Sequence, residues 1–261
     1  MRQTTKNSPG LFLKVLAVAG ALSMMGWATA QTSVSTPKAS APIQLVALDT
    51  IFTDKSNHSV DDIDRNELQV FEDGKAQVLD SLTKETKPVK YAIAIDASLS
   101  FRNVFASSLG ACKLLIDSNS AGDETALIRF VSSDKITKEQ DFTSDKSRLG
   151  NVLGQLFLEG GQSAVIDAVY LAVQTVGPEF AGRRAVVLVS DGEDRKSVHT
   201  VDELVKLLRE NEVRVFVIGV VAQLDNDAGS IGETPRQKAE QLLNRMARET
   251  GGRVFFPRKV N

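Results

Sequence analysis

Two aspartates and three serines stand in three separate segments of the chain and offer oxygen ligands. Asp96, Ser98 and Ser100 alternate in YAIAIDASLS, Ser163 lies in EGGQSAVIDA, and Asp191 lies in SDGED. Mg²⁺ prefers near-octahedral oxygen coordination, is held through one or two carboxylates, and keeps positions for water or a partner. Two carboxylates and three hydroxyls meet this demand and leave the coordination sphere incomplete. The sequence therefore predicts a site for a divalent cation, Mg²⁺ or else Mn²⁺ or Ca²⁺.

Other reactive side chains are few and scattered. Cys112 is the only cysteine, and its place in the apolar stretch LGACKLLI predicts a buried, inert thiol. His58 and His199 are the only histidines and are too scattered for a zinc site. Gly160 and Gly161 lack the lysine that follows the glycines of a phosphate-binding loop. The pattern favours oxygen ligation of a cation over nucleophilic, zinc or phosphate chemistry.

A strand must position the first of these segments. The apolar run before Asp96 predicts a buried strand of a parallel sheet, and open α/β sheets place ligand sites at the carboxyl ends of such strands. In the loop that follows, alternate residues can turn to one side. We therefore expect Asp96, Ser98 and Ser100 to converge while Ala97 and Leu99 point inward.

Strand-like and helix-like segments alternate from residue 91 to the end of the chain. Strands are expected at 91–96, 125–131, 135–143, 185–190, 213–221 and 253–256. Helices are expected at 101–118, 146–157, 164–176, 201–211 and 235–250. This alternation predicts an α/β fold, with a doubly wound, mostly parallel, Rossmann-like sheet flanked by helices.

The start of the chain has the organisation of an export signal. Arg2 and Lys6 are followed by a largely apolar stretch and by Ala-Thr-Ala, a small-x-small cleavage site, at residues 28–30. An uncleaved membrane anchor is the alternative, but Lys14 leaves the apolar run short of the ~20 residues needed to span a bilayer. We expect a signal peptide at 1–30, no stable membrane insertion after its cleavage, and an exported chain, either periplasmic or secreted.

Two short regions separate this signal from the α/β domain. Residues 31–42 are rich in Ser, Thr, Ala and Pro, which is typical of a flexible linker. Residues 43–88 contain strand-like runs on either side of Asp73-Gly74, a strong signal for a two-residue hairpin. We expect a small β-rich module there, packed on the domain that follows because it is too short to be stable alone.

The charge balance argues against nucleic acid as a partner. Of the 31 basic side chains, three leave with the signal peptide, and 28 remain against 33 acidic ones. The remainder forms no basic stripe and no polybasic membrane patch. We therefore expect no nucleic-acid binding.

The three oxygen-bearing segments together resemble the von Willebrand factor type A domain. Its metal-ion-dependent adhesion site has the pattern Asp-x-Ser-x-Ser, then a Thr in a Gly-Gly-Thr-like loop, then an Asp in a Ser/Thr-Asp-Gly loop. The corresponding positions here are Asp96, Ser98, Ser100, Ser163 and Asp191. Order and spacing agree over residues 89–256, and the expected domain spans 89–261.

The resemblance implies a role for each of these positions. Ser98 and Ser100 would coordinate the cation directly, Ser163 would supply a third hydroxyl, and the two aspartates would bind directly or through water. The open coordination position would take a carboxylate from a partner protein. Asp167 resembles an acidic residue of the family that supports the ligands without binding the cation.

Departures from the family pattern concern one loop and the end of the chain. Ser163 replaces the usual Thr and follows an additional Gln162. The chain ends at Asn261 without the C-terminal helix that covers the sheet in family members, so we expect part of the sheet to be bare. The segment DDIDRNELQVFEDGKAQVLDSL is similar to the β module that precedes the type A domain in exported bacterial proteins called VWFA-related.

These observations favour a non-enzymatic, exported protein-binding or adhesion module that recognises a partner through the cation. One alternative is a Mg²⁺-dependent phosphohydrolase with Asp96 as nucleophile; another is a metal-free scaffold that docks a neighbouring chain. Locally, Ser100 could instead cap a helix starting near Phe101, and Glu193 and Asp194 are expected to be surface charges. The oligomeric state stays open.

Overall fold

The computed structural model describes residues 45–257 of the chain, apart from 49, 51, 56–59, 61, 85–86, 181 and 225–231. The expected signal peptide and linker lie outside the described residues. The chain divides into two compact units, Met1–Glu85 and Thr86–Asn261.

A β-hairpin forms in the first unit, after a short 3-10 helix η1 (Arg65–Glu67). Strand β1 (Val70–Glu72) pairs antiparallel with β2 (Lys75–Gln77). Asp73 and Gly74 form the turn with φ of 48° and 78°. Both central residues of this turn type need positive φ, which Asp-Gly tolerates, so the predicted hairpin is confirmed.

The second unit contains a six-stranded sheet with the order β5-β4-β3-β6-β7-β8. Its strands are β3 (Val89–Asp96), β4 (Glu124–Phe130), β5 (Ile136–Thr143), β6 (Arg183–Ser190), β7 (Arg214–Gly219) and β8 (Val254–Phe255). Edge strand β5 runs antiparallel to β4, and the other neighbours are parallel. The predicted doubly wound, mostly parallel sheet is confirmed.

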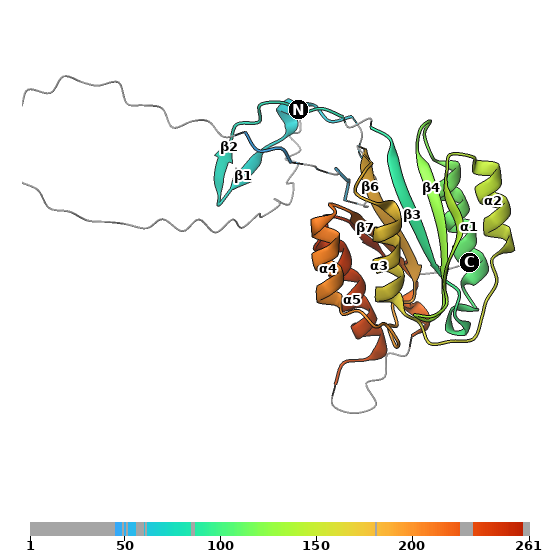
Figure 1. Ribbon diagram of the computed structural model, residues 1–261. Helices are drawn as coiled ribbons and strands as arrows, with labels where there is room; N and C mark the ends of the chain where they lie inside the picture. Colours follow the sequence, from blue (N-terminus) through green and yellow to red (C-terminus); the bar gives the residue numbers. More distant parts are fainter. Residues whose placement is uncertain are drawn as a thin grey trace, which may run out of the picture. The chain divides into compact units, whose positions relative to one another are not determined.

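Helices cover both faces of this sheet (Figure 1). They are α1 (Phe105–Asp117), α2 (Lys146–Gln155), α3 (Val165–Val176), α4 (Val201–Glu210) and α5 (Pro235–Arg248). α3, α4 and α5 pack against one face, and α1 and α2 pack against the other. Short 3-10 helices η2 (Leu99–Phe101) and η3 (Val221–Gln223) follow β3 and β7.

The central strand β3 shows why its sequence is a continuous apolar run. Ala92 and Ala94 belong to the core beneath α3, whereas Ile93 and Ile95 belong to the core beneath α1. A strand buried on both faces needs apolar residues at every position. Packing on both faces holds β3 in place, and Asp96, its last residue, lies at the carboxyl edge of the sheet.

Cys112 lies on the buried side of α1 and is fully buried. Burial raises the pKa of its thiol to about 12, so the reactive thiolate does not form near neutral pH. This bears out the expected inert thiol. Among the described residues, no helix is long and apolar enough to span a bilayer.

The β6–β7–β8 half of the sheet is less covered on the α1 side. Phe216 and Ile218 are only partly buried there, and Phe255 is 60% exposed. Their neighbours on the opposite face, Val215 and Val217, are buried beneath the other helices. In the part of the chain that the structure describes, this apolar surface has no covering helix.

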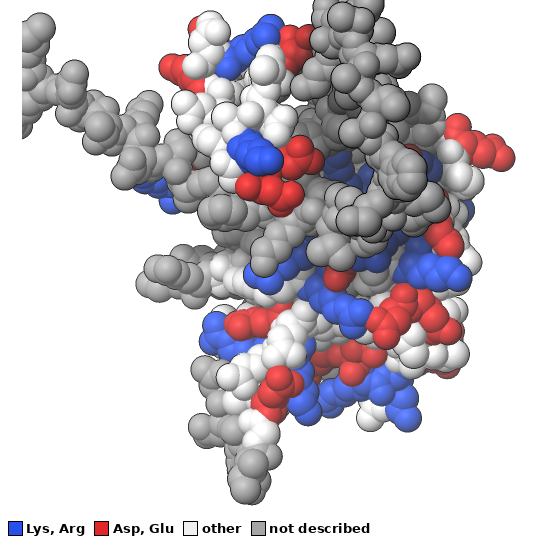
Figure 2. Space-filling view, turned by 90° about the vertical axis from the view of Figure 1, so that its left-hand side faces the viewer, with Lys and Arg blue, Asp and Glu red and all other residues white. Residues whose placement is uncertain are grey.

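Helices α4 and α5 carry charges of both signs on their outer faces. Arg209 pairs with Glu249, and Arg245 pairs with Asp202, so the pairs link the two helices. Figure 2, which faces this side of the molecule, shows Lys and Arg side chains interspersed with Asp and Glu.

Candidate functional site

The first loop of the site, loop 1 (residues 96–100), begins at the carboxyl end of β3. Asp96 is fully buried; it accepts hydrogen bonds from the Ser98 backbone N–H at 3.0 Å and from the Ser190 hydroxyl at 2.8 Å. The hydroxyls of Ser98 and Ser100 lie 2.9 Å apart. Loop 1 thus holds one carboxylate and two hydroxyls close together.

The helix-capping interpretation of Ser100 is wrong. α1 begins at Phe105 after Val104 rather than near Phe101, and Ser100 lies inside η2. Ser98 is the N-cap residue of η2 but makes no capping hydrogen bond with its side chain. Both serine hydroxyls are therefore available for the site rather than committed to helix ends.

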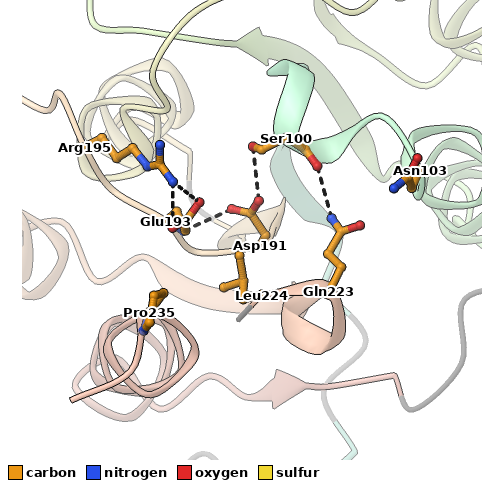
Figure 3. Close-up of a pocket in the computed structure, with 8 residues that line it drawn as sticks. All are labelled: Ser100, Asn103, Asp191, Glu193, Arg195, Gln223, Leu224 and Pro235. Atoms are coloured by element: carbon orange, nitrogen blue, oxygen red, sulfur yellow. Dashed lines mark hydrogen bonds and ion pairs between the residues drawn. The ribbon is translucent and has the colours of Figure 1, made fainter. Parts of the chain in front are cut away.

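Loop 3 (residues 190–199), which follows β6, brings the second carboxylate to loop 1. Asp191 is fully buried and accepts a hydrogen bond from the Ser100 hydroxyl at 3.3 Å and from the Glu193 N–H at 3.0 Å (Figure 3). Ser190 donates to Asp96, as noted above, and its hydroxyl accepts from the Gly192 N–H at 3.0 Å. Ser190 was not among the predicted site residues.

Loop 2 (residues 156–164) supplies Ser163 and is tied to both other loops. The Ser163 hydroxyl hydrogen-bonds with Asp96, and its carbonyl accepts from the N–H groups of Arg195 and Lys196 at 2.8 and 3.2 Å. On the other side, the Glu159 N–H donates to the Ala97 carbonyl at 2.8 Å. The structure therefore brings all five predicted residues together through direct hydrogen bonds.

Two further aspartates fasten loop 3 to the start of α3. Asp167 accepts from the N–H groups of Val198 and His199 at 2.8 and 2.9 Å, and lies 2.8 Å from the His199 ring nitrogen Nδ1. Asp194 accepts from the Ile166 N–H at 3.1 Å. The expectation that Asp194 is a surface charge is wrong, because it satisfies a backbone donor of the first helical turn.

Burial controls the electrostatics of the site. It raises the pKa of Asp96, although the hydrogen bonds from Ser98, Ser190 and Ser163 act to lower it. Burial, and then the charge of Asp96, raises the pKa of Asp191 to about 7. At Asp167, by contrast, burial is outweighed by donated hydrogen bonds, which hold its pKa below the ordinary value.

The donor set fits a hard divalent cation. A positive charge between two buried carboxylates relieves their mutual repulsion and so stabilises both ionised groups. The other oxygen atoms around them belong to serine hydroxyls. Among the described residues, no group of three or more His, Cys, Asp or Glu side chains is placed to hold a metal. The site is therefore of the carboxylate-and-hydroxyl kind, with oxygen ligands suited to Mg²⁺, Mn²⁺ or Ca²⁺.

Leu99 departs from the prediction that it points inward. Ala97 is fully buried as expected, but Leu99 is 48% exposed. The 3-10 turn at Leu99–Phe101 replaces the extended alternation assumed for the loop, and Phe101 occupies the core instead. An apolar side chain thus lies at the surface between the two candidate ligands Ser98 and Ser100.

A hollow of about 350 Å³ opens beside the site (Figure 3). Its lining residues are Ser100, Asn103, Asp191, Glu193, Arg195, Gln223, Leu224 and Pro235. Gln223 donates to the Ser100 carbonyl at 3.3 Å, and Arg195 forms a double hydrogen bond with the Glu193 carboxylate. The hollow shares Ser100 and Asp191 with the candidate cation site.

Charge pairs on loop 2 give a first prediction. Glu159 pairs with Arg129 on β4 at 3.1 Å and with Lys135, just before β5, at 2.7 Å, which fixes loop 2 at the point where its backbone meets loop 1. We expect Glu159→Gln to weaken Mg²⁺ binding about tenfold, the usual effect of losing a group that orients metal ligands. The matched control is Glu139→Gln, because Glu139 also pairs with Arg129 but lies on β5. Calorimetric titration measures both; equal losses of affinity would contradict the positioning role of Glu159.

Comparison with known proteins bears on this geometry. A family model described as the von Willebrand factor type A domain matches residues 92–261. The fold is similar to that of an aerotolerance-related membrane protein from Bacteroides fragilis, with 20% identity, a TM-score of 0.53, and coverage of 65% of this chain and 91% of that chain. It is also similar to BatB from Bacteroides thetaiotaomicron, with 20% identity, a TM-score of 0.52, and coverage of 64% and 89%.

A von Willebrand factor type A structure from Catenulispora acidiphila is similar as well, with 15% identity, a TM-score of 0.53, and coverage of 67% of this chain and 39% of that chain. At these identities the likeness to solved structures establishes the fold alone.

Proposed function

The chain belongs to the von Willebrand factor type A domain family, and from that premise we propose that it is an exported module that binds a partner protein through a divalent cation. Type A domains are adhesion and protein-interaction modules, generally without enzymatic activity, and commonly hold a divalent metal. The proposal for this chain names Asp96, Ser98, Ser100, Ser163 and Asp191 as its ligands and Mg²⁺ as the preferred cation.

The observation that carries the proposal is the buried pair Asp96 and Asp191. Both carboxylates are fully buried, and burial raises the pKa of each. Burying two like charges in contact with the same serine cluster costs stability unless a cation neutralises them. A purely structural role would be served equally well by uncharged residues.

In the proposed mechanism the residues around the cation have different roles. Asp96 and Asp191 would supply the compensating negative charge, and the hydroxyls of Ser98, Ser100 and Ser163 would be the neutral ligands of the cation. Ser190 and the backbone N–H of Ser98 keep Asp96 oriented. When bound, the cation would supply the positive charge to which a carboxylate of the partner binds.

The surroundings of Asp96 support binding rather than phosphate chemistry. Its hydrogen-bond partners are the Ser98 backbone N–H and the hydroxyls of Ser98, Ser163 and Ser190. None of these partners is a general acid of the kind that hydrolysis of a phosphoenzyme uses. A screen with phosphate esters and Mg²⁺ is expected to show no turnover; turnover that is lost in Asp96→Asn would favour the hydrolase.

Cation titration of the full chain tests the proposed function. We expect calorimetry to show one saturable site for Mg²⁺ and Mn²⁺, and Asp141→Asn, an exposed aspartate on β5, to leave it unchanged. The titration is repeated with acetate present, because a carboxylate can complete the coordination sphere. Failure of every cation to bind, with and without acetate, would falsify the proposal and favour a metal-free scaffold that docks through the partly covered β6–β7–β8 face.

A further inference from the structure

The mouth of the candidate cation site is asymmetric along the edge of the sheet. The site lies at the ends of β3 and β6, between β4 on one side and β7 on the other. Loop 2 reaches loop 1 from the β4 side, through the bridge between Ser98 and Glu159. The hollow lies on the β7 side, because η3 and the first residue of α5 line it.

On the β4 side an exposed apolar side chain lies next to the cation site. Leu99 is 48% exposed, although it stands between two ligand residues. Gly160 lies beside it, and a Cβ atom at Gly160 would be only 3.8 Å from the Leu99 Cδ1 atom. The absence of a side chain at Gly160 therefore leaves this flank of Leu99 open to a partner.

On the β7 side the hollow combines polar groups with the apolar side chains of Leu224 and Pro235. Its charged groups are Asp191, whose charge is assigned to the cation, and the pair Glu193 and Arg195. Glu193 and Arg195 neutralise each other through their double hydrogen bond, and Asn103 and Gln223 contribute amides that both donate and accept hydrogen bonds. Figure 3 shows Ser100 and Asp191 between Arg195 and Asn103. A charged side chain finds no uncompensated counter-charge in such a wall, whereas an uncharged polar one finds both donors and acceptors.

We propose that the partner contacts the site with an extended segment whose Asp or Glu is flanked by an apolar residue on Leu99 and an uncharged polar residue in the hollow. This inference rests on the proposed function, because the carboxylate is held by the cation. Side chains of an extended segment point to the same side at every second residue. The flanking residues therefore lie two positions before and two positions after the acidic residue.

Selection of peptides from a random linear library tests the pattern. The library is displayed on phage, bound to the full chain in Mg²⁺, and eluted with chelator. We expect the eluted peptides to contain Asp or Glu with an aliphatic or aromatic residue two positions to one side and Ser, Thr, Asn or Gln two positions to the other. Enrichment of acidic peptides without these neighbours would overturn the inference and leave the proposed function intact.

One selected peptide is then made synthetically and measured against variants. Leu99→Ser is expected to weaken binding of this peptide, because an apolar contact is lost. The loss of peptide affinity should be about ten times larger than any change in Mg²⁺ affinity. The control is Leu114→Ser, since Leu114 is also exposed but lies on α1. Equal peptide affinities of these two variants would overturn the apolar half of the proposal.

The hollow is tested by a double-mutant comparison. Replacing the polar residue of the peptide by Gly should weaken binding to the wild-type chain about tenfold, but should have little effect on Asn103→Trp, in which the added ring fills the hollow. If the Gly replacement weakened peptide binding equally in the wild-type chain and in Asn103→Trp, the polar residue of the peptide would not lie in the hollow, and this part of the proposal would be overturned. Failure to obtain any chelator-eluted peptide would overturn both this inference and metal-dependent partner binding.

Discussion

Asp96→Asn is expected to weaken Mg²⁺ binding about a thousandfold while leaving the metal-free chain at least as stable as the wild type. A unit charge pair 4 Å apart is worth about 4 kcal/mol at the effective dielectric constant of about 20 that suits protein sites, which corresponds to about three powers of ten in affinity. The amide keeps nearly the same shape, so the hydrogen bond from the Ser98 N–H is retained by the remaining oxygen.

The opposite effect on stability follows from the electrostatics. Burial and the charge of Asp96 together raise the pKa of Asp191 to about 7. Removing the charge at Asp96 relieves this repulsion in the metal-free state and removes a buried ionised group. If Asp96 only capped a turn, its replacement would lower the free energy of unfolding and would leave the Mg²⁺ affinity unchanged.

Two measurements on the same protein decide between these roles. Calorimetry gives the Mg²⁺ affinity, and chemical unfolding in the presence of chelator gives the free energy of unfolding. Asp141→Asn serves as the matched control on the protein surface. A marked loss of metal-free stability in Asp96→Asn, with Mg²⁺ affinity unchanged, would show that the carboxylate is structural.

The strands were predictable from sequence because burial on both faces requires uninterrupted apolar runs. The stretch AVVLVS became β6, with Val186 and Leu188 in one core and Val189 in the other. Ends of elements were less predictable, since they depend on local caps. The first helix begins four residues later than expected because the chain makes the 3-10 turn at Leu99–Phe101 first.

The candidate site was predictable where three loops had matching residue types, but its supporting contacts were not. Ser190 stands at the Ser/Thr position of the Ser/Thr-Asp-Gly pattern, but that pattern does not show that its hydroxyl orients Asp96. Asp194 has no pattern that distinguishes it from a surface residue, yet it holds the first turn of α3. The pairing of Arg129 with Glu159 joins residues 30 positions apart, a contact that only the folded sheet defines. The exposure of Leu99 likewise depends on the 3-10 turn.

The pH dependence of stability gives the second large effect. Asp191 has a pKa of about 7 in the folded chain, above its ordinary value of 3.8. Between these pH values the folded state holds a proton that the unfolded state has lost, so the metal-free chain loses stability as pH rises. Since each pKa unit corresponds to about 1.4 kcal/mol, the contribution of Asp191 to this loss is on the order of 4 kcal/mol once pH exceeds 7.

Cation binding cancels this dependence. Mg²⁺ binds the ionised carboxylate and must displace the proton below pH 7, so its apparent affinity should rise about tenfold per pH unit up to pH 7 and level off above it. The stabilisation that a fixed Mg²⁺ concentration provides should grow over the same range. The carboxylate therefore destabilises the metal-free chain most strongly under the conditions in which it binds the cation best.

Unfolding free energies at several pH values from 5 to 8.5, with chelator and with Mg²⁺, test this coupling, and Asp191→Asn is the reference. Relative to that variant, the wild-type chain should lose stability as pH rises to 7 in chelator but keep it in saturating Mg²⁺, because tighter cation binding, about 1.4 kcal/mol per pH unit, offsets the loss. Other titrating groups contribute equally to both proteins and cancel in the difference. A wild-type curve that runs parallel to that of Asp191→Asn in chelator would contradict the raised pKa of Asp191. A loss of stability with rising pH in Mg²⁺ that is as large as the loss in chelator would remove Asp191 from the cation site.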